Sequence, residues 1–84
     1  MKKFFLDARE LEHPKPLEQA IVALRELDEE NYFYMLHRKK PIPLIELARK
    51  QYFQVFSHED ESGAWHILIS KNTTINLSSL IETF

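Results

Sequence analysis

The chain has 84 residues, of which 44% are hydrophobic and 29% charged, and this length allows one small domain and excludes a second. It contains no cysteine, so disulfides and thiol chemistry are excluded. Its net charge of −2 gives no general attraction to nucleic acid or anionic lipid, and neither is expected as a partner.

The first predicted element is a strand over residues 3–8, because its apolar residues 4–6 are contiguous, as in a strand covered on both faces. The chain starts with a basic tip like an export signal, but the apolar run ends at Asp7, whereas a signal needs about 7 to 15 apolar residues. No segment approaches the roughly 18 apolar residues of a membrane span. We therefore expect a soluble, cytoplasmic domain.

A helix is predicted over residues 14–27, where apolar side chains recur at helical spacing and polar ones point the other way. Pro14 and Pro16 suit its first turn, where a missing N–H costs little. The polar residues 28–31 end it. The apolar face of this helix consists of Leu17, Ala20, Ile21, Leu24 and Leu27.

Residues 32–36 are aromatic and apolar, which predicts a second strand that runs into the polar loop 37–41. A second, shorter helix then opens at Pro43. The residues that share its apolar face are Leu44, Leu47 and Ala48.

The last third of the domain predicts a β-hairpin, in which strands over residues 52–56 and 64–70 are joined by the polar stretch 58–63 with the only glycine. A strand-helix-strand unit normally makes a right-handed crossover between parallel strands. The order β-α-β-α-β-β therefore predicts an α+β fold, a four-stranded mixed sheet with both helices on one face.

The other face of this sheet would carry half of the aromatic strand residues, which is more apolar surface than a small monomer usually exposes. One predicted cover is the tail, residues 73–84, which follows a domain of residues 1–72 and forms a last helical turn with Ser78 or Ser79 as N-cap. The other is the second copy in a symmetric homodimer. The apolar residues of the tail are Ile75, Leu77, Leu80, Ile81 and Phe84.

The segment 6–17 resembles the signature of TusA/SirA-like proteins, a leucine-aspartate strand end followed by Cys-Pro-x-Pro. Asp7 ends the strand, His13 stands in place of the cysteine, and Pro14 and Pro16 keep the rest of the motif. For cysteine-bearing relatives the resemblance implies a persulfide handed between proteins in sulfur relay. That chemistry needs a thiolate near the helix N-terminus, so it does not carry over to a histidine.

Two further features resemble a cysteine-free branch of this superfamily, a family of unknown function numbered 2249. The first is the pair Pro41 and Pro43 at the start of the second helix. The second is the sequence Trp-His-Ile-Leu-Ile at residues 65–69 in the final strand. The resemblance covers about residues 3–71 and implies a two-layer α/β sandwich. Gln51 stands near the place where relatives usually close the helix with glycine, so this helix is expected to end differently.

If the first two strands are parallel, the loops that follow them lie at one edge of the sheet, where α/β folds tend to bind ligands. Two helix N-termini add partial positive charge there, so a small anion could be held. Pro14 removes one N–H, and the site would therefore depend on side chains. The alternative is that residues 37–40 form a solvated loop and that His13 starts a helix without a ligand. The candidate binding residues are Arg9, His13, Lys15, His37, Arg38, Lys39 and Lys40.

Other chemistries have weaker support. The four histidines match no known metal-ligand spacing, and no metal or cofactor is expected. The acidic run 59–61 is typical of an exposed connection, and one glycine cannot build a phosphate loop or a dinucleotide fingerprint. The strand aromatics could stack bases, but the chain is acidic, and core or dimer packing is the favoured explanation of the same residues.

These observations predict a non-enzymatic binding module that docks a protein partner or holds a small anion. The alternative is an accessory of sulfur relay or redox metabolism that binds a cysteine-bearing carrier without carrying sulfur itself. An enzymatic role would need a proton-transfer residue, and His13 is the one at the superfamily's active position.

Overall fold

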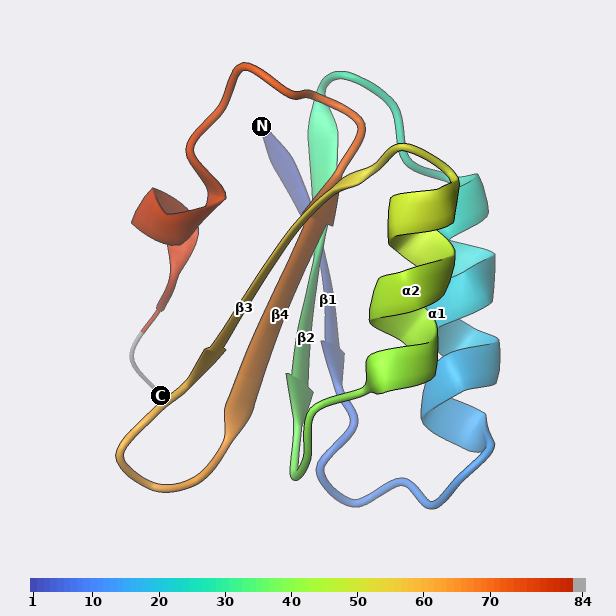
Figure 1. The fold of residues 1–84 in the computed structure, drawn as a ribbon, viewed down its shortest axis with the longest axis vertical. Coiled ribbons are helices and arrows are strands. Elements are labelled where there is room, and N and C mark those ends of the chain that lie inside the picture. Colours follow the sequence, from blue (N-terminus) through green and yellow to red (C-terminus); the bar gives the residue numbers. More distant parts are fainter. Residues whose placement is uncertain (83–84) are drawn as a thin grey trace.

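The structure, a computed structural model, describes residues 1–82 and places two helices on one face of a four-stranded sheet (Figure 1). This arrangement confirms the predicted α+β sandwich. No helix in the described part is long and apolar enough to cross a membrane. In chain order the elements are β1 (Lys2–Asp7), α1 (Lys15–Arg25), β2 (Asn31–His37), α2 (Ile42–Lys50), β3 (Gln54–Glu59), β4 (Trp65–Ser70) and the 3-10 turn η1 (Leu77–Leu80).

The strands lie in the order β1-β2-β4-β3, with β1 parallel to β2 and the other pairs antiparallel. The predicted hairpin of β3 and β4 is confirmed. All seven residues of β2 are buried, because this strand is central and covered on both faces. The prediction that the first strand is covered on both faces is wrong, since β1 is an edge strand and Phe5 is 43% exposed.

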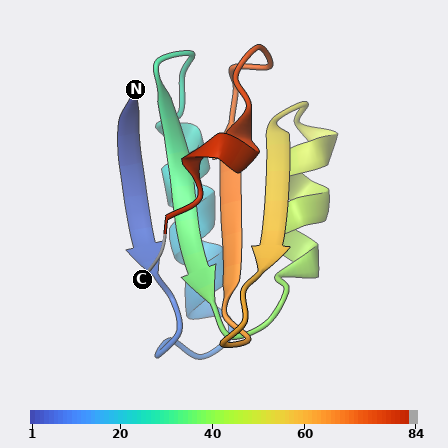
Figure 2. The same cartoon turned by 90° about the vertical axis from the view of Figure 1, so that its left-hand side faces the viewer.

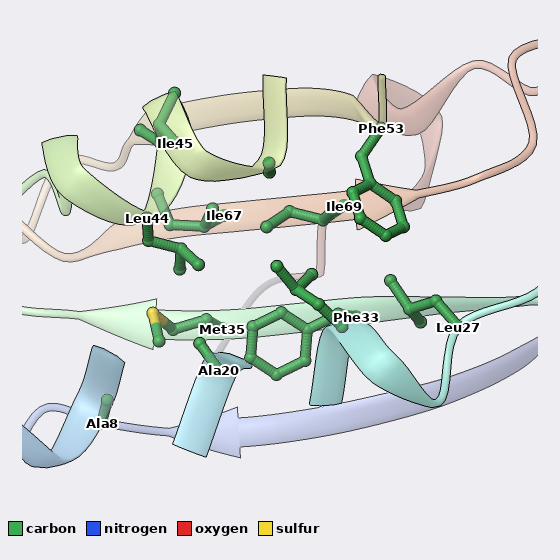
Figure 3. Packing of buried hydrophobic residues seen from close by; sticks show 12 residues of the cluster. Ala8, Ala20, Leu27, Phe33, Met35, Leu44, Ile45, Phe53, Ile67 and Ile69 are labelled. Carbon is green, nitrogen blue, oxygen red and sulfur yellow. The ribbon is translucent and has the colours of Figure 1, made fainter. Parts of the chain in front are cut away.

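The main core lies between the sheet and the two helices (Figure 3). Alternate residues of β2 and β4, Phe33, Met35, Ile67 and Ile69, point toward the helices because successive strand residues face opposite sides. Small residues let α1 and α2 approach the sheet, as at Ala20. The predicted apolar face of α2 is slightly rotated, and its buried residues are Leu44, Ile45 and Ala48.

The described part of the tail, through residue 81, lies over the opposite face of the sheet (Figure 2). Leu77 is 1% exposed and packs in a second cluster that includes Tyr34 and Leu68. The predicted N-cap of the turn is wrong: the cap is Asn76, whose Oδ1 accepts from the Ser78 N–H at 3.2 Å. The part of the prediction that falls on Phe84 lies outside the described residues.

The end of α2 explains why β3 starts two residues later than predicted. The Phe53 N–H donates to the Ala48 carbonyl and the Tyr52 N–H to the Arg49 carbonyl, both at 3.0 Å. These two bonds form a Schellman motif, in which the residue after the helix takes the left-handed conformation. That residue is Tyr52, with φ of 64°, and its side chain is 90% exposed.

Replacing Tyr52 with glycine is expected to raise the free energy of unfolding by about 1 kcal/mol, because glycine has no Cβ to oppose a positive φ. Few contacts are lost, since the tyrosine side chain is almost fully exposed. Urea unfolding of the wild type and the variant measures the effect. Tyr52→Ala is the matched control, because it removes the ring but keeps the Cβ; an equal gain in both variants would contradict the explanation.

Candidate functional site

A hollow of about 400 Å³ lies where β1 and β2 end and α1 and α2 begin. The parallel pairing of β1 with β2 brings the two following loops to this edge, as the sequence predicts. The apolar lining of this hollow comes from the loop after β1, from both helices and from β2. The apolar residues concerned are Leu11, Leu17, Met35 and Leu44.

Charged side chains line the same hollow and give it an excess of positive charge. Three consecutive cations, Arg38, Lys39 and Lys40, come from the loop between β2 and α2, and His13 comes from the loop before α1. Glu12 is the acidic residue in the lining. The combination of an apolar lining with clustered cations suits an anionic group attached to an apolar body.

His37 ends β2 beneath these cations and is 7% exposed. Burial, followed by the nearby charges of Lys39 and Arg38, lowers the pKa of His37 below its ordinary value. Its Nδ1 accepts from the Lys39 N–H at 3.3 Å, which ties the loop to the strand. At neutral pH the imidazole is therefore uncharged, and the positive charge of the hollow comes from the loop cations.

Two of the predicted binding residues lie outside the hollow. Arg9 donates from Nε and Nη2 to the two carboxylate oxygens of Asp7, at 2.9 and 2.7 Å. This hydrogen bonding lowers the pKa of Asp7. The two contacts tie Arg9 to the end of β1, and it is not part of the lining of the hollow. Lys15 is the first residue of α1 and is exposed, but it is not part of the lining.

The helix N-termini offer few backbone donors to a ligand. Pro16 and Pro43 stand in the first turns and carry no N–H. The Lys15 N–H donates to the Glu12 carbonyl at 3.0 Å, and the Ile42 N–H to the Lys40 carbonyl at 3.0 Å. A ligand in the hollow must therefore be held mainly by side chains, as the sequence predicts for Pro14.

A second polar cluster lies on the tail side of the sheet. His66 is 2% exposed; its Nδ1 is 2.7 Å from the Tyr34 hydroxyl and its Nε2 is 2.7 Å from Asp60 Oδ2. The ionised Asp60 carboxylate can only accept, so Nε2 donates to it. In that tautomer of the neutral imidazole Nδ1 accepts from the Tyr34 hydroxyl, whose oxygen also accepts from the Glu82 N–H at 2.9 Å.

This cluster resembles a catalytic relay in its residue types, but its position indicates a structural role. Tyr34 is fully buried under the tail, so it cannot reach a substrate. Asp60 Oδ1 also accepts from Ser62 and Ala64 within the hairpin connection. The hydrogen bonds thus fasten the hairpin to the centre of the sheet. Sequence reasoning missed the cluster, because its members are 32 and 6 positions apart in the chain.

Metal binding has no support in the described part of the chain. Residues 1–82 contain no group of three or more potential metal ligands. Of the four histidines considered, His13 and His37 line the hollow, whereas His58 and His66 face each other on neighbouring strands with ring centroids 6.1 Å apart.

Comparison with known proteins adds a family and a fold. The family model described as "Uncharacterized conserved protein (DUF2249)" matches residues 5–71. A SirA-like protein from Desulfitobacterium hafniense, known from a crystal structure, is similar with a TM-score of 0.71 and 24% sequence identity, over 81% of this chain and 96% of that one. This likeness confirms the SirA-like fold. No curated protein matches the chain.

Proposed function

The chain belongs to the DUF2249 family of uncharacterized conserved proteins, and we propose that it is a non-enzymatic binding domain whose hollow holds an acidic group attached to an apolar body. A segment of a partner protein that combines carboxylates with apolar side chains has this chemistry. The observation that carries the proposal is the lining of the hollow, where three consecutive cations border an apolar surface.

The scarcity of backbone donors favours this kind of ligand over a free inorganic anion. Phosphate sites at helix N-termini use several N–H groups, and the prolines and local hydrogen bonds remove most of them here. Mobile lysine and arginine side chains can instead pair with carboxylates at varied positions. The apolar lining adds affinity of about 0.8 kcal/mol for each methylene that is buried.

The domain is proposed to act without catalysis and in the cytoplasm, where a chain without disulfides is stable. His37 is uncharged at neutral pH and largely buried, so it is poorly placed to exchange protons with a ligand. His13 lines the hollow, yet the lining contributes no serine, threonine or cysteine that it could activate as a nucleophile. These features support binding over chemistry.

The test is an amide-resolved NMR titration with phosphate, sulfate, thiosulfate, acetate and hexanoate at constant ionic strength. We expect saturable shifts confined to residues 11–17 and 37–44, with hexanoate bound about tenfold more tightly than acetate if two methylenes are buried. The pKa of His37 should rise when the anion is bound, since a nearby negative charge favours the imidazolium. Shifts spread evenly over the chain would contradict the proposal.

Combining Lys39→Gln with Lys40→Gln is expected to weaken hexanoate binding by about tenfold, because two exposed ion pairs contribute roughly 0.2 to 1 kcal/mol each. The matched control combines Lys50→Gln with Lys71→Gln, which makes the same charge change at exposed positions, at the end of α2 and directly after β4, that do not line the hollow. The control should bind like the wild type. Equal losses in the two variants would mean that only the overall charge matters.

The alternative proposal is an accessory role in sulfur relay, in which the hollow binds a cysteine-bearing carrier. It is favoured by the position of His13, which lines the hollow where sulfur-carrying relatives of the TusA/SirA-like superfamily have cysteine. This version predicts saturable affinity for a persulfide carrier that is lost on His13→Ala. A general binding module shows no preference for such a carrier.

A further inference from the structure

One of the three cations of the hollow differs from the others, because its ammonium group is held against an aromatic ring. Lys40 Nζ lies over the Trp65 ring, 5.5 Å from the ring centroid, which is within the range of a cation–π contact. The side chains of Arg38 and Lys39 make no hydrogen bond, ion pair or ring contact within residues 1–82. Among these three neighbours, Lys40 therefore has a fixed direction and the other two are mobile.

Trp65 is itself well fixed. It is the first residue of β4 and stands opposite His37 of β2 in the antiparallel register. Successive strand residues face opposite sides, so Trp65 lies on the same side of the sheet as Ile67 and Ile69, which is the side of the helices. Its half-buried side chain packs against the main core there. The ring is therefore a firm support for the lysine that lies over it.

The backbone near Lys40 is restrained as well. The Lys40 carbonyl accepts from the Ile42 N–H at 3.0 Å, and the Lys39 N–H donates to His37 Nδ1 at 3.3 Å. A long lysine side chain loses much rotamer freedom when a ligand orders it, and this loss opposes binding. Because Lys40 is held at both its backbone and its ammonium group, a smaller part of this loss remains to be incurred when an anion binds.

We propose that Trp65 positions Lys40 as the fixed cation of the hollow, so that an anion meets one preplaced ammonium group and two mobile cations. An ammonium group has three N–H donors, so contact with the ring on one side leaves donors for a carboxylate on the other. Trp65 does not line the hollow, and it acts through Lys40 without touching the ligand. This role rests on the proposed binding function, because it concerns the same hollow.

The experiment compares the binding of hexanoate by the wild type and by Trp65→Leu, followed through the amide shifts of residues 11–17 and 37–44. Leucine keeps an apolar side chain against the core but offers Lys40 no ring. The Kd for hexanoate should therefore rise about two- to fivefold, which corresponds to an exposed cation–π contact. Amide spectra confirm that the variant is folded. An unchanged Kd in the folded variant would overturn the proposal.

A double-mutant cycle separates positioning from a general effect on the structure. In the Lys40→Gln background the ring has no cation to hold, so adding Trp65→Leu should not weaken hexanoate binding further. In the matched Lys39→Gln background Lys40 is still present, and Trp65→Leu should cause the same two- to fivefold loss. Equal losses in the two backgrounds would overturn the proposal, because Trp65 would then act on the loop as a whole.

A measurement on the wild type decides the question even if Trp65→Leu fails to fold. Protons that lie over an aromatic ring resonate upfield, so the ε-methylene protons of Lys40 should lie upfield of those of Lys39, both in the free protein and at saturating hexanoate. Loss of this upfield shift on binding would overturn the proposal, since the ligand would be drawing Lys40 away from the ring.

The outcomes also distinguish this role from the binding function on which it rests. A wild type that does not bind hexanoate at all would overturn both. Hexanoate binding by the wild type that is unaffected by Trp65→Leu would overturn the positioning role alone and leave the hollow as the binding site.

Discussion

Replacing Leu77 with alanine is expected to lower the free energy of unfolding by about 3 kcal/mol, the middle of the range for a fully buried leucine. Leu77 is 1% exposed and fixes the tail over the apolar face of the sheet. A domain of this size has a total stability of roughly 4 to 13 kcal/mol at about 0.05 to 0.15 kcal/mol per residue, so the loss is a large share.

Urea unfolding measures the loss, and the binding of a hydrophobic dye reports whether the sheet face opens. The matched control is Leu80→Ala, the same truncation at a half-buried position of the same turn. It should cost about 1 kcal/mol, because less apolar area is returned to water. Equal effects at the two positions would show that the tail is not held by the side chain of Leu77.

Replacing His66 with phenylalanine is expected to lower the free energy of unfolding by about 2 to 3 kcal/mol, although the ring shape is kept. The buried Tyr34 hydroxyl loses its hydrogen bond to His66 and Asp60 loses a donor, and the loss of a hydrogen bond by a buried polar group is costly. His58→Phe is the matched control. It makes the same change at an exposed position of β3 and should alter stability by less than about 0.5 kcal/mol.

The same variant should change the response of the protein to acid. Hydrogen bonds from Ser62 and then His66 hold the pKa of Asp60 well below its ordinary range. A carboxyl with a lowered folded-state pKa contributes stability that is present above its unfolded pKa of about 3.9 and is lost as pH falls below that value. The pKa of Asp60 should rise in His66→Phe, so this acid-dependent loss should be smaller. An unchanged Asp60 titration would contradict the assigned hydrogen bond.

The periodicity of the sequence was sufficient to predict the layers of the fold. Helical spacing over residues 14–27 and alternation from Trp65 to Ser70 reflect which side chains face the core, and burial is the strongest constraint on residue type. The expected parallel pairing of the first two strands also predicted the edge where the two loops meet. Of the residues predicted for the site, five line the hollow, namely His13, His37, Arg38, Lys39 and Lys40.

What the sequence could not predict depends on which of several compatible contacts or backbone conformations is formed. Arg9 lies outside the hollow because Asp7 binds it, and either a free or a paired arginine is compatible with that spacing. The contact between Tyr34 and His66 joins side chains on β2 and β4. The register in which these two strands pair cannot be predicted from the sequence of either strand alone. Tyr52 ends α2 without the glycine that usually marks a left-handed residue, so the boundary was misplaced.

The order of the strands has a consequence for the synthesis of the protein. β4 lies between β2 and β3, yet it is the last of the four strands to leave the ribosome. A nascent chain that stops before Trp65 can pair β1 with β2, but it has no strand to join β3 to them. Because pairing of this kind is non-local, folding should be late and cooperative. The tail packs against Leu68 of β4, so it can dock only after β4 has joined the sheet, and the second face of the sheet is therefore expected to close last.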